Sequence, residues 1–190
     1  MTQAPAPTRR AEILAAAADL FARRGYHGVS IADLGRAVGL TGPALYRHFR
    51  GKDALLAEIL LDISRRLLEE GVRRAALPDP ARALDALLEW HVDFALDNPQ
   101  LITVHERELD NVPEPQRHEI RRAQRAYVEE WVGVLCRLHD MPAERARAAV
   151  HAVFGLLNST PHSAGALDRA AMGKLLCAMA SAALHRAARP

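Results

Sequence analysis

Residues 30–55 decide the fold of this chain, and they read SIADLGRAVGLTGPALYRHFRGKDAL. Ser30 and Thr41 each stand directly before a short run with helical spacing, and both residue types cap helix N-termini. Gly39 separates the two runs and lets the chain turn at positive φ. Two short helices joined by a tight, glycine-containing turn form a helix-turn-helix, which is what this stretch predicts. Three apolar side chains would lock the two helices together: Leu34, Val38 and Leu45.

The second helix of the pair is expected to run to Gly51 and to expose small and hydrogen-bonding residues: Thr41, Gly42, Ala44, Arg47 and His48. Small side chains at its start let the backbone approach the major groove of DNA, whereas Arg47 and His48 can donate to base edges or phosphates. Lys52 opens the following helix, where its ammonium and the free backbone N–H groups suit a phosphate.

Outward from this stretch the apolar spacing stays helical, and no alternating run predicts a strand. Prolines punctuate the chain between further helices, for which we expect nine in all. The predicted fold is therefore all-α, with an N-terminal three-helix helix-turn-helix domain (1–55) and a C-terminal helical domain (56–190). A long fourth helix, 52–74, links the two domains.

Composition supports a globular chain of one or two domains. The 190 residues are 49% hydrophobic and 25% charged. Cys136 and Cys177 lack CxxC spacing, which favours two reduced thiols and a cytoplasmic protein. The N-terminus has no signal-peptide pattern. Residues 148–167 carry no Asp, Glu, Lys or Arg, but their polar cluster breaks any apolar span, so we expect a buried helix and a loop there and no membrane partner.

Charge is unevenly divided along the chain. Residues 1–55 hold eight basic and four acidic side chains, whereas the remainder has a net charge of −2. A basic head on an acidic body is the electrostatic footprint of a nucleic-acid-binding protein, although charge alone fits an ordinary solvated surface equally well.

Enzyme and metal motifs find no support in the sequence. Residues 105–109 begin like a zinc-protease helix but lack the second histidine, and no histidine pair has i,i+4 spacing. A nucleophile elbow and a phosphate-cradling glycine loop are also missing. We therefore expect no catalytic residue, no metal site and no cofactor.

The head resembles the DNA-binding signature of the TetR family of transcriptional regulators. The resemblance rests on SIADL at 30–34, AVGLTGPALYRHF at 37–49 and KDAL at 52–55, and it covers residues 13–56 without an insertion. Gly35 replaces the usual alanine, which should weaken its helix by roughly 0.5–1 kcal/mol unless packing compensates. Arg47 stands where the family varies and would tune sequence preference. The resemblance implies DNA contacts from Thr41, Pro43, Tyr46, Arg47 and His48, further contacts from Ser30 and Arg36, and a phosphate contact from Lys52.

The body offers candidates for a small-molecule pocket, because apolar walls and a few polar tips fall on its predicted helices. The larger aromatic side chains could equally be plain core, and Asn158 and His162, like His151, could instead belong to a helix-end hydrogen-bond network. The candidate effector-binding residues are Trp90, His91, Phe94, Ile102, His105, Tyr127, Trp131, Phe154, Asn158 and His162.

The last two predicted helices, 143–158 and 167–188, expose alanine faces that permit close helix approach. They resemble the dimer interface of the family, which implies a homodimer on a palindromic operator. The expected function is a repressor released from double-stranded DNA by a small hydrophobic effector. Residues 152–163 and 105–108 resemble regulators of lipid or acyl-CoA metabolism. A drug-responsive efflux repressor, an activator, and an interaction module without ligand are the alternatives.

Overall fold

The computed structural model describes residues 8–163 and 167–188. These residues form helices and no strand, as the all-α prediction requires: nine helices of five or more residues, a four-residue turn α9 (Thr160–Ser163) and a 3-10 turn η1 (Leu109–Asn111). The nine are α1 (Arg9–Arg24), α2 (Ile31–Ala37), α3 (Gly42–Tyr46), α4 (Lys52–Ala75), α5 (Pro80–Asp97), α6 (Pro99–Glu108), α7 (Glu114–His139), α8 (Ala143–Leu157) and α10 (Arg169–Ala187).

Side-chain caps position the first three helices, and those of α2 and α3 are the predicted Ser30 and Thr41. Thr8 accepts a hydrogen bond from the Ala11 amide at the start of α1, and Thr41 accepts from the Ala44 amide at the start of α3. Ser30 and Asp33 form a reciprocal capping box on α2. Each of these bonds spans three residues, so the sequence alone determines where the helices begin.

Helix α3 is shorter than predicted, since it ends at Tyr46 rather than reaching Gly51. The amides of Arg47 and His48 bond three residues back, which tightens the chain into a turn. The freed carbonyl of His48 accepts a hydrogen bond of 2.8 Å from the Arg10 guanidinium of α1. The turn also places Phe49 in the core.

At Gly35 the packing favours glycine, which is the compensation that the sequence left open. A Cβ at this position would lie 2.6 Å from the carbonyl oxygen of Leu40, whose amide also donates to the Gly35 carbonyl. This close approach folds the turn between α2 and α3 back onto α2. Gly39, at φ 65°, completes the turn.

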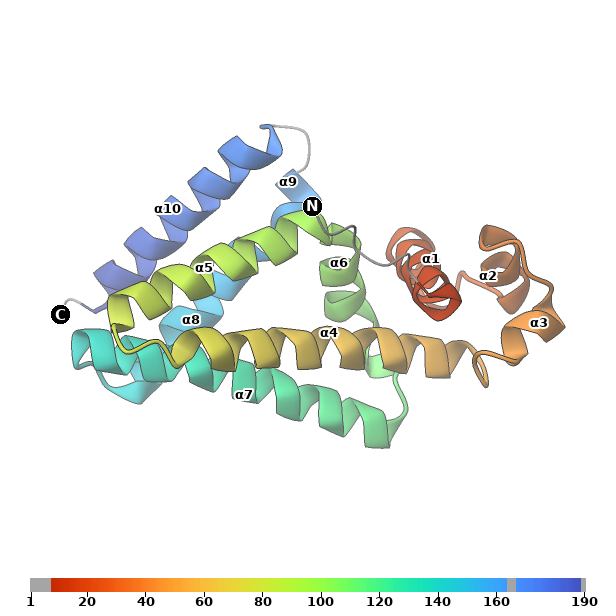
Figure 1. Ribbon diagram of the computed structural model, residues 1–190, viewed down its shortest axis with the longest axis horizontal. Helices are drawn as coiled ribbons and strands as arrows, with labels where there is room; N and C mark the ends of the chain where they lie inside the picture. Colours follow the sequence, from red (N-terminus) through yellow and green to blue (C-terminus); the bar gives the residue numbers. More distant parts are fainter. Residues whose placement is uncertain (1–7, 164–166, 189–190) are drawn as a thin grey trace.

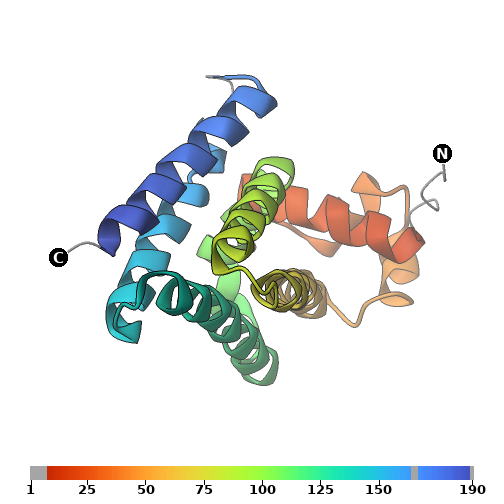
Figure 2. The ribbon, with the colours of Figure 1, turned by 60° about the vertical axis from the view of Figure 1, so that its left-hand side comes forward.

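Helix α4 runs through most of the molecule, with α1–α3 at one end (Figure 1). It packs against α7 and α5 in the body and against α1 and α6 toward the head. Helices α8 and α10 pack on each other, and α10 lies at the end of the body remote from α1–α3 (Figures 1 and 2). The shared long helix makes head and body one connected structure.

Two hydrophobic cores fill this structure. The first joins α1–α3 and the N-terminal half of α4 to Phe94, Ile102, Val104 and Ile120 of the body. The second is built from the far half of the body, and Trp131 is its largest fully buried side chain. Since the first core reaches into α5–α7, the division at residue 55 stays a prediction.

The uncharged stretch 148–167 contains the end of α8 and, around Pro161, the single turn α9 in place of the expected loop; residues 164–166 lie outside the described part. In the described ranges, no helix combines the length and apolarity needed to cross a membrane. Cys136 and Cys177 are both free thiols.

Candidate nucleic-acid interface and internal cavity

Helix α3 presents an open surface at the end of the molecule. Tyr46 is 55% exposed, so its ring does not pack into the core. Arg47 is also exposed, whereas Gly42 and His48 are half-buried at the edge of the same surface. Leu45, on the opposite side of the helix, is buried and anchors it. The predicted contact residues Thr41, Pro43, Tyr46 and Arg47 therefore all reach solvent.

The predicted contacts of α2 have local partners. Ser30 donates to the Asp33 carboxylate and caps the helix, and Arg36 forms an ion pair with the same carboxylate. These bonds hold the pKa of Asp33 well below its usual range, the Ser30 hydroxyl contributing most. Arg36 remains exposed and within reach of a partner molecule.

Lys52 clamps the head together. Its ammonium donates to the carbonyls of Tyr26 (2.7 Å) and Val29 (2.9 Å) and lies 4.1 Å from the centre of the Tyr26 ring. An ammonium has three donors, so one is left for the phosphate that was predicted. The residue therefore has a structural task that the sequence pattern did not indicate.

Tyr26 connects the head to the body. Its amide donates to the buried carboxylate of Glu108, at the end of α6, over 3.1 Å, and its hydroxyl bonds to Asp53 of α4. Glu108 is only 7% exposed, and its second oxygen accepts from the Asn111 side chain at 2.8 Å. A buried carboxylate is tolerated because both oxygens are hydrogen-bonded. The end of α6 is thus fixed to the loop between α1 and α2.

An internal cavity of about 200 Å³ lies between α4, α5, α6, α7 and α8, where the two cores meet. Seven predicted effector residues line it: His91, Phe94, Ile102, His105, Tyr127, Phe154 and Asn158. His151, considered above for a helix-end network, also lines the cavity, and six further lining residues were not considered: Ile63, Ser64, Leu67, Leu101, Gln124 and Val128. We refer to these fourteen residues as the inner cavity.

A hydrogen-bonded chain forms the polar end of the inner cavity. His91 Nε2 lies 3.1 Å from Asn158 Oδ1, which can only accept, so Nε2 carries the proton. His91 Nδ1 then accepts from the Tyr127 hydroxyl at 3.0 Å. Burial lowers the pKa of His91 to about 4 and raises that of Tyr127, which keeps both groups neutral. The Asn158 amide N–H groups remain as donors for a ligand.

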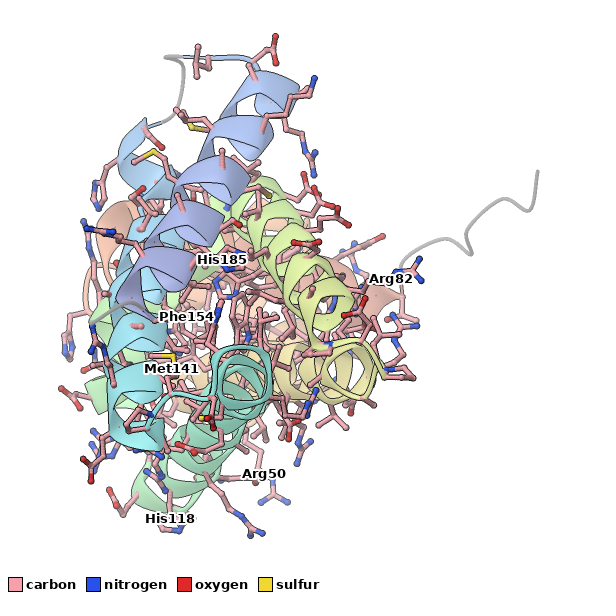
Figure 3. The ribbon with its side chains drawn as sticks, turned by 90° about the vertical axis from the view of Figure 1, so that its left-hand side faces the viewer. Arg50, Arg82, His118, Met141, Phe154 and His185 are labelled. Atoms are coloured by element: carbon pink, nitrogen blue, oxygen red, sulfur yellow. The ribbon has the colours of Figure 1, made fainter. Side chains whose placement is uncertain are left out.

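Stacked rings support this chain. The rings of His91, Tyr127 and Phe154 form a triangular cluster, with centroid distances of 5.8 Å (His91–Tyr127), 4.7 Å (His91–Phe154) and 5.5 Å (Tyr127–Phe154). Phe154 points into the interior of the helical body (Figure 3). Gly71 of α4 makes room for Tyr127, because a Cβ there would lie 2.6 Å from the ring. A glycine inside a long helix is the signal that could have revealed this contact.

Three predicted effector residues do not line the inner cavity. Trp131 is fully buried behind it and meets Phe154 edge-on at 5.1 Å. Trp90 faces α4, where the Arg74 guanidinium lies 4.6 Å from its ring. His162 is exposed on α9. Trp90 and His91 are adjacent on α5 and therefore point in different directions from the helix. The prediction assigned both to the effector site, but only His91 lines the cavity.

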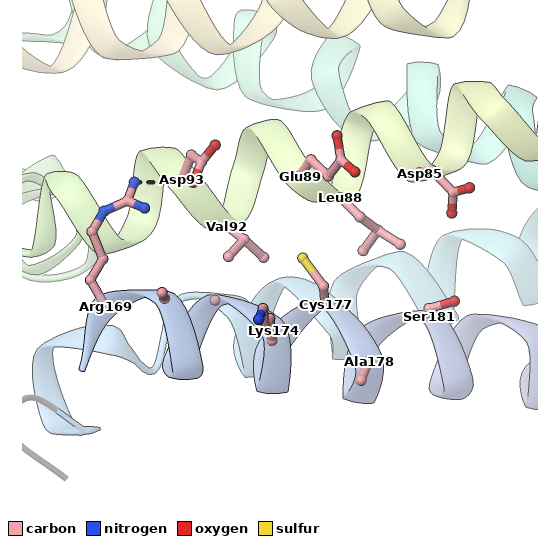
Figure 4. Close-up of a pocket in the computed structure, with 12 residues that line it drawn as sticks. Asp85, Leu88, Glu89, Val92, Asp93, Arg169, Lys174, Cys177, Ala178 and Ser181 are labelled. Atoms are coloured by element: carbon pink, nitrogen blue, oxygen red, sulfur yellow. Dashed lines mark hydrogen bonds and ion pairs between the residues drawn. The ribbon is translucent and has the colours of Figure 1, made fainter. Parts of the chain in front are cut away.

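A second hollow, about 530 Å³, lies between α5 and α10. Carboxylates of α5 border it, and Arg169 of α10 pairs with Asp93 across one end at 3.0 Å (Figure 4). None of the predicted effector residues lines this hollow. The described residues also hold no group of three or more side chains arranged to bind a metal ion.

Comparisons with known proteins agree with this arrangement. Residues 13–59 match the bacterial regulatory proteins of the tetR family, and residues 77–184 match the tetracyclin repressor-like C-terminal domain. The chain therefore belongs to the TetR family, which consists of transcription regulators and not of enzymes. The resemblance seen in the sequence is confirmed.

Individual relatives cover most of the chain. The HTH-type transcriptional activator FasR of Mycolicibacterium smegmatis is 32% identical over 149 residues, which make up 75% of this chain and 66% of FasR. The HTH-type transcriptional repressor KstR2 of Rhodococcus jostii is 28% identical over 129 residues, 67% of this chain and 63% of KstR2. The crystal structure of PfmR from Thermus thermophilus superposes with a TM-score of 0.81 at 25% identity, covering 94% of this chain and 97% of PfmR.

Three curated relatives match more than half of this chain. The matched part spans 55–66% of the length of those relatives.

Proposed function

We propose that this chain acts in the cytoplasm as a homodimer that binds a palindromic operator and represses transcription until a small hydrophobic effector fills the inner cavity. The exposed surface of α3 supports the DNA-binding half of this proposal. Its Tyr46 hydroxyl and Arg47 guanidinium are free to meet phosphates and base edges. The basic balance of residues 1–55 adds attraction for the DNA backbone.

Helix α6 carries the effector half. Leu101, Ile102 and His105 line the inner cavity, and three residues after His105 the carboxylate of Glu108 holds the Tyr26 amide. A ligand that moves α6 therefore acts directly on the loop that positions α2. The ligand can lower the affinity of the protein for DNA only to the extent that it binds the released state more tightly than the DNA-bound state.

The chemistry of the inner cavity favours an apolar effector with one hydrogen-bond acceptor. Its walls come mostly from apolar and aromatic side chains, and the Asn158 amide can donate to a carbonyl oxygen. The acyl chain and carbonyl group of a lipid-related or acyl-CoA effector fit this description. A hydrophobic drug also offers such groups, so an efflux repressor is the second candidate.

Helices α8 and α10 support the dimer. Leu175 and Met179 are 44% and 47% exposed on α10, next to exposed Ala178 and Ala182. Burying the alanine faces of segments 143–158 and 167–188 against a second copy, away from the side of α8 that contacts α7, would place the two α3 helices roughly 34–36 Å apart. Sedimentation velocity checks the association, and a monomer at micromolar concentration would contradict it.

The names of the relatives do not decide between repression and activation. FasR is named an activator and KstR2 a repressor, so the relatives support either sign. A closed, dry core would favour an interaction module without ligand. The cavity in this body instead supports a ligand-binding function.

DNase footprinting on the DNA beside the gene, over a salt series, tests the regulator. A protected palindrome with a steep salt dependence is expected. Arg47→Ala should relax discrimination at one base pair by about 1–3 kcal/mol, while Lys52→Ala weakens all sequences alike. An equal loss on specific and scrambled DNA for Arg47→Ala would refute its assigned role.

Filling the cavity tests the effector half. Ile102→Trp should lower operator affinity without any ligand, because the added ring occupies the ligand's space beside α6. Val72→Trp, on an exposed position of α4, is the matched control. Unchanged affinity in a folded Ile102→Trp protein would count against ligand gating.

A further inference from the structure

The inner cavity adjoins a surface hollow of about 300 Å³ between α7 and α8. Three residues belong to both spaces: Gln124, Val128 and His151. The Gln124 amide bonds to His105 on the inside, so its side chain forms the boundary between the two. We call the surface hollow the mouth; it is lined by Gln124, Arg125, Val128, Glu129, Arg147 and His151.

The two spaces differ in charge. Among the described residues no Asp, Glu, Lys or Arg lines the inner cavity, and burial lowers the pKa of both His91 and His105. An ionised group placed there would find no counter-charge, which makes its burial costly. The mouth, in contrast, holds two arginines and one glutamate.

The arginines of the mouth are available to an anion. Within the described residues Arg125 has no ion-pair partner. Arg147 forms two bonds to Glu129, of 2.7 and 2.9 Å, but the two side chains are 41% and 50% exposed. An ion pair at such exposure contributes little, so an incoming anion can replace the carboxylate of Glu129. A cation would instead meet two guanidinium groups.

We infer that the effector is an amphiphilic anion whose apolar chain occupies the inner cavity and whose carboxylate or phosphate group lies in the mouth against Arg125 and Arg147. This inference rests on the proposed function, since it assigns the ligand class of the same cavity. It also gives Glu129 a definite role: the carboxylate occupies Arg147 in the empty protein and competes with the ligand.

Calorimetric titration of the full chain with four eight-carbon probes tests the inference: octanoate, octyl phosphate, 1-octanol and octyltrimethylammonium. Octanoate, octyl phosphate or both should bind about tenfold tighter than octanol, and the cation should bind more weakly than octanol. The tighter of the two anions identifies the headgroup. The preference for anions should shrink as salt is added.

Variants of the mouth sharpen the test. Arg125→Gln and Arg147→Gln should each weaken the preferred anion about five- to tenfold and leave octanol unchanged. Glu129→Gln should tighten anion binding, a direction that a merely structural role of the ion pair would not produce. Arg122→Gln, on the same helix but outside the mouth, is the matched control.

Equal affinity for octanol and the anions would overturn the inference, as would an Arg147→Gln variant that weakens octanol and the anion equally. Failure of all four probes to bind at millimolar concentration would also overturn it. None of these results touches the DNA footprint, so failure of the ligand class and failure of the proposed regulator are distinguishable.

Discussion

The recognition unit α2–α3 and the inner cavity are held together over different distances along the chain. In the unit, the side chains of Ser30 and Thr41 bond to amides three residues away. In the cavity, His91 bonds to Tyr127 and Asn158, which are 36 and 67 residues away. A local pattern can be recognised in a sequence, whereas a long-range pair exists only once the helices have packed.

The largest expected change in the free energy of unfolding comes from a buried aromatic residue of the body, and an exposed aromatic residue of α3 serves as the comparison. Trp131→Ala should lower the free energy of unfolding by about 3–5 kcal/mol, because it leaves a void in the second core. Tyr46→Ala, on the surface of α3, should change it by less than about 0.5 kcal/mol. Urea denaturation measures both. Similar losses for the two variants would mean that the Tyr46 ring packs against the fold.

Lowering the pH should reduce the free energy of unfolding, because His91 is buried as a neutral group at the inner cavity. Its pKa is about 4 in the folded protein against an ordinary value of 6.5, so the unfolded chain binds more protons between these values. Stability should be complete above pH 6.5 and fall as the pH drops toward 4, by roughly 3 kcal/mol from this group. His105 shifts in the same direction.

Urea midpoints between pH 7 and pH 4 measure this dependence. In His91→Gln the slope should flatten, with only the part due to His105, His139 and acidic groups left. An unaltered slope would show that His91 is not the neutral, buried group described above.

The next largest effect is expected at the hydrogen bond between Glu108 of α6 and the Tyr26 amide, which connects the body to the head. Glu108→Ala leaves the buried Tyr26 amide without an acceptor and should cost about 2 kcal/mol of stability. Glu108→Gln keeps one acceptor oxygen and should lose less. Hydrogen exchange at the Tyr26 amide is the direct measurement, and protection equal to wild type in Glu108→Ala would contradict the contact.

The smallest expected effect compares two helical glycines. Gly35→Ala should destabilise by about 1 kcal/mol, since the new methyl group would press on the Leu40 carbonyl. Gly133→Ala in α7 meets open space and should stabilise by about 0.5–1 kcal/mol. Thermal unfolding of the pair decides, and stabilisation by both would remove the close approach as the reason for Gly35.

The helical fold and the surface of α3 could be predicted because their determinants are local. Caps, glycine turns and proline breaks placed most helix ends correctly, but the turn that ends α3 is also bonded to Arg10, which lies 38 residues before His48. Lys52 was recognised as the start of α4, but its bonds to Tyr26 and Val29 are tertiary.

The inner cavity was predicted in part for the same reason. Seven of the candidates in the α5–α8 region do line the cavity, whereas the contributions of Ile63 and Leu67 depend on how α4 packs. Glu108 and Gly71 left only weak signals, a charge at a helix end and a glycine in a helix interior. Their roles follow from Tyr26 and Tyr127, residues that only the fold brings near.

The position of the inner cavity between two cores has a consequence for divergence within a lineage. Phe94 and Ile102 belong to the first core and Tyr127 to the second, so a substitution that reshapes the cavity there also costs stability. Gln124 and His151 belong to neither core and lie at the mouth. Inherited changes in effector preference should therefore accumulate first at these rim positions, while the DNA-reading surface stays untouched.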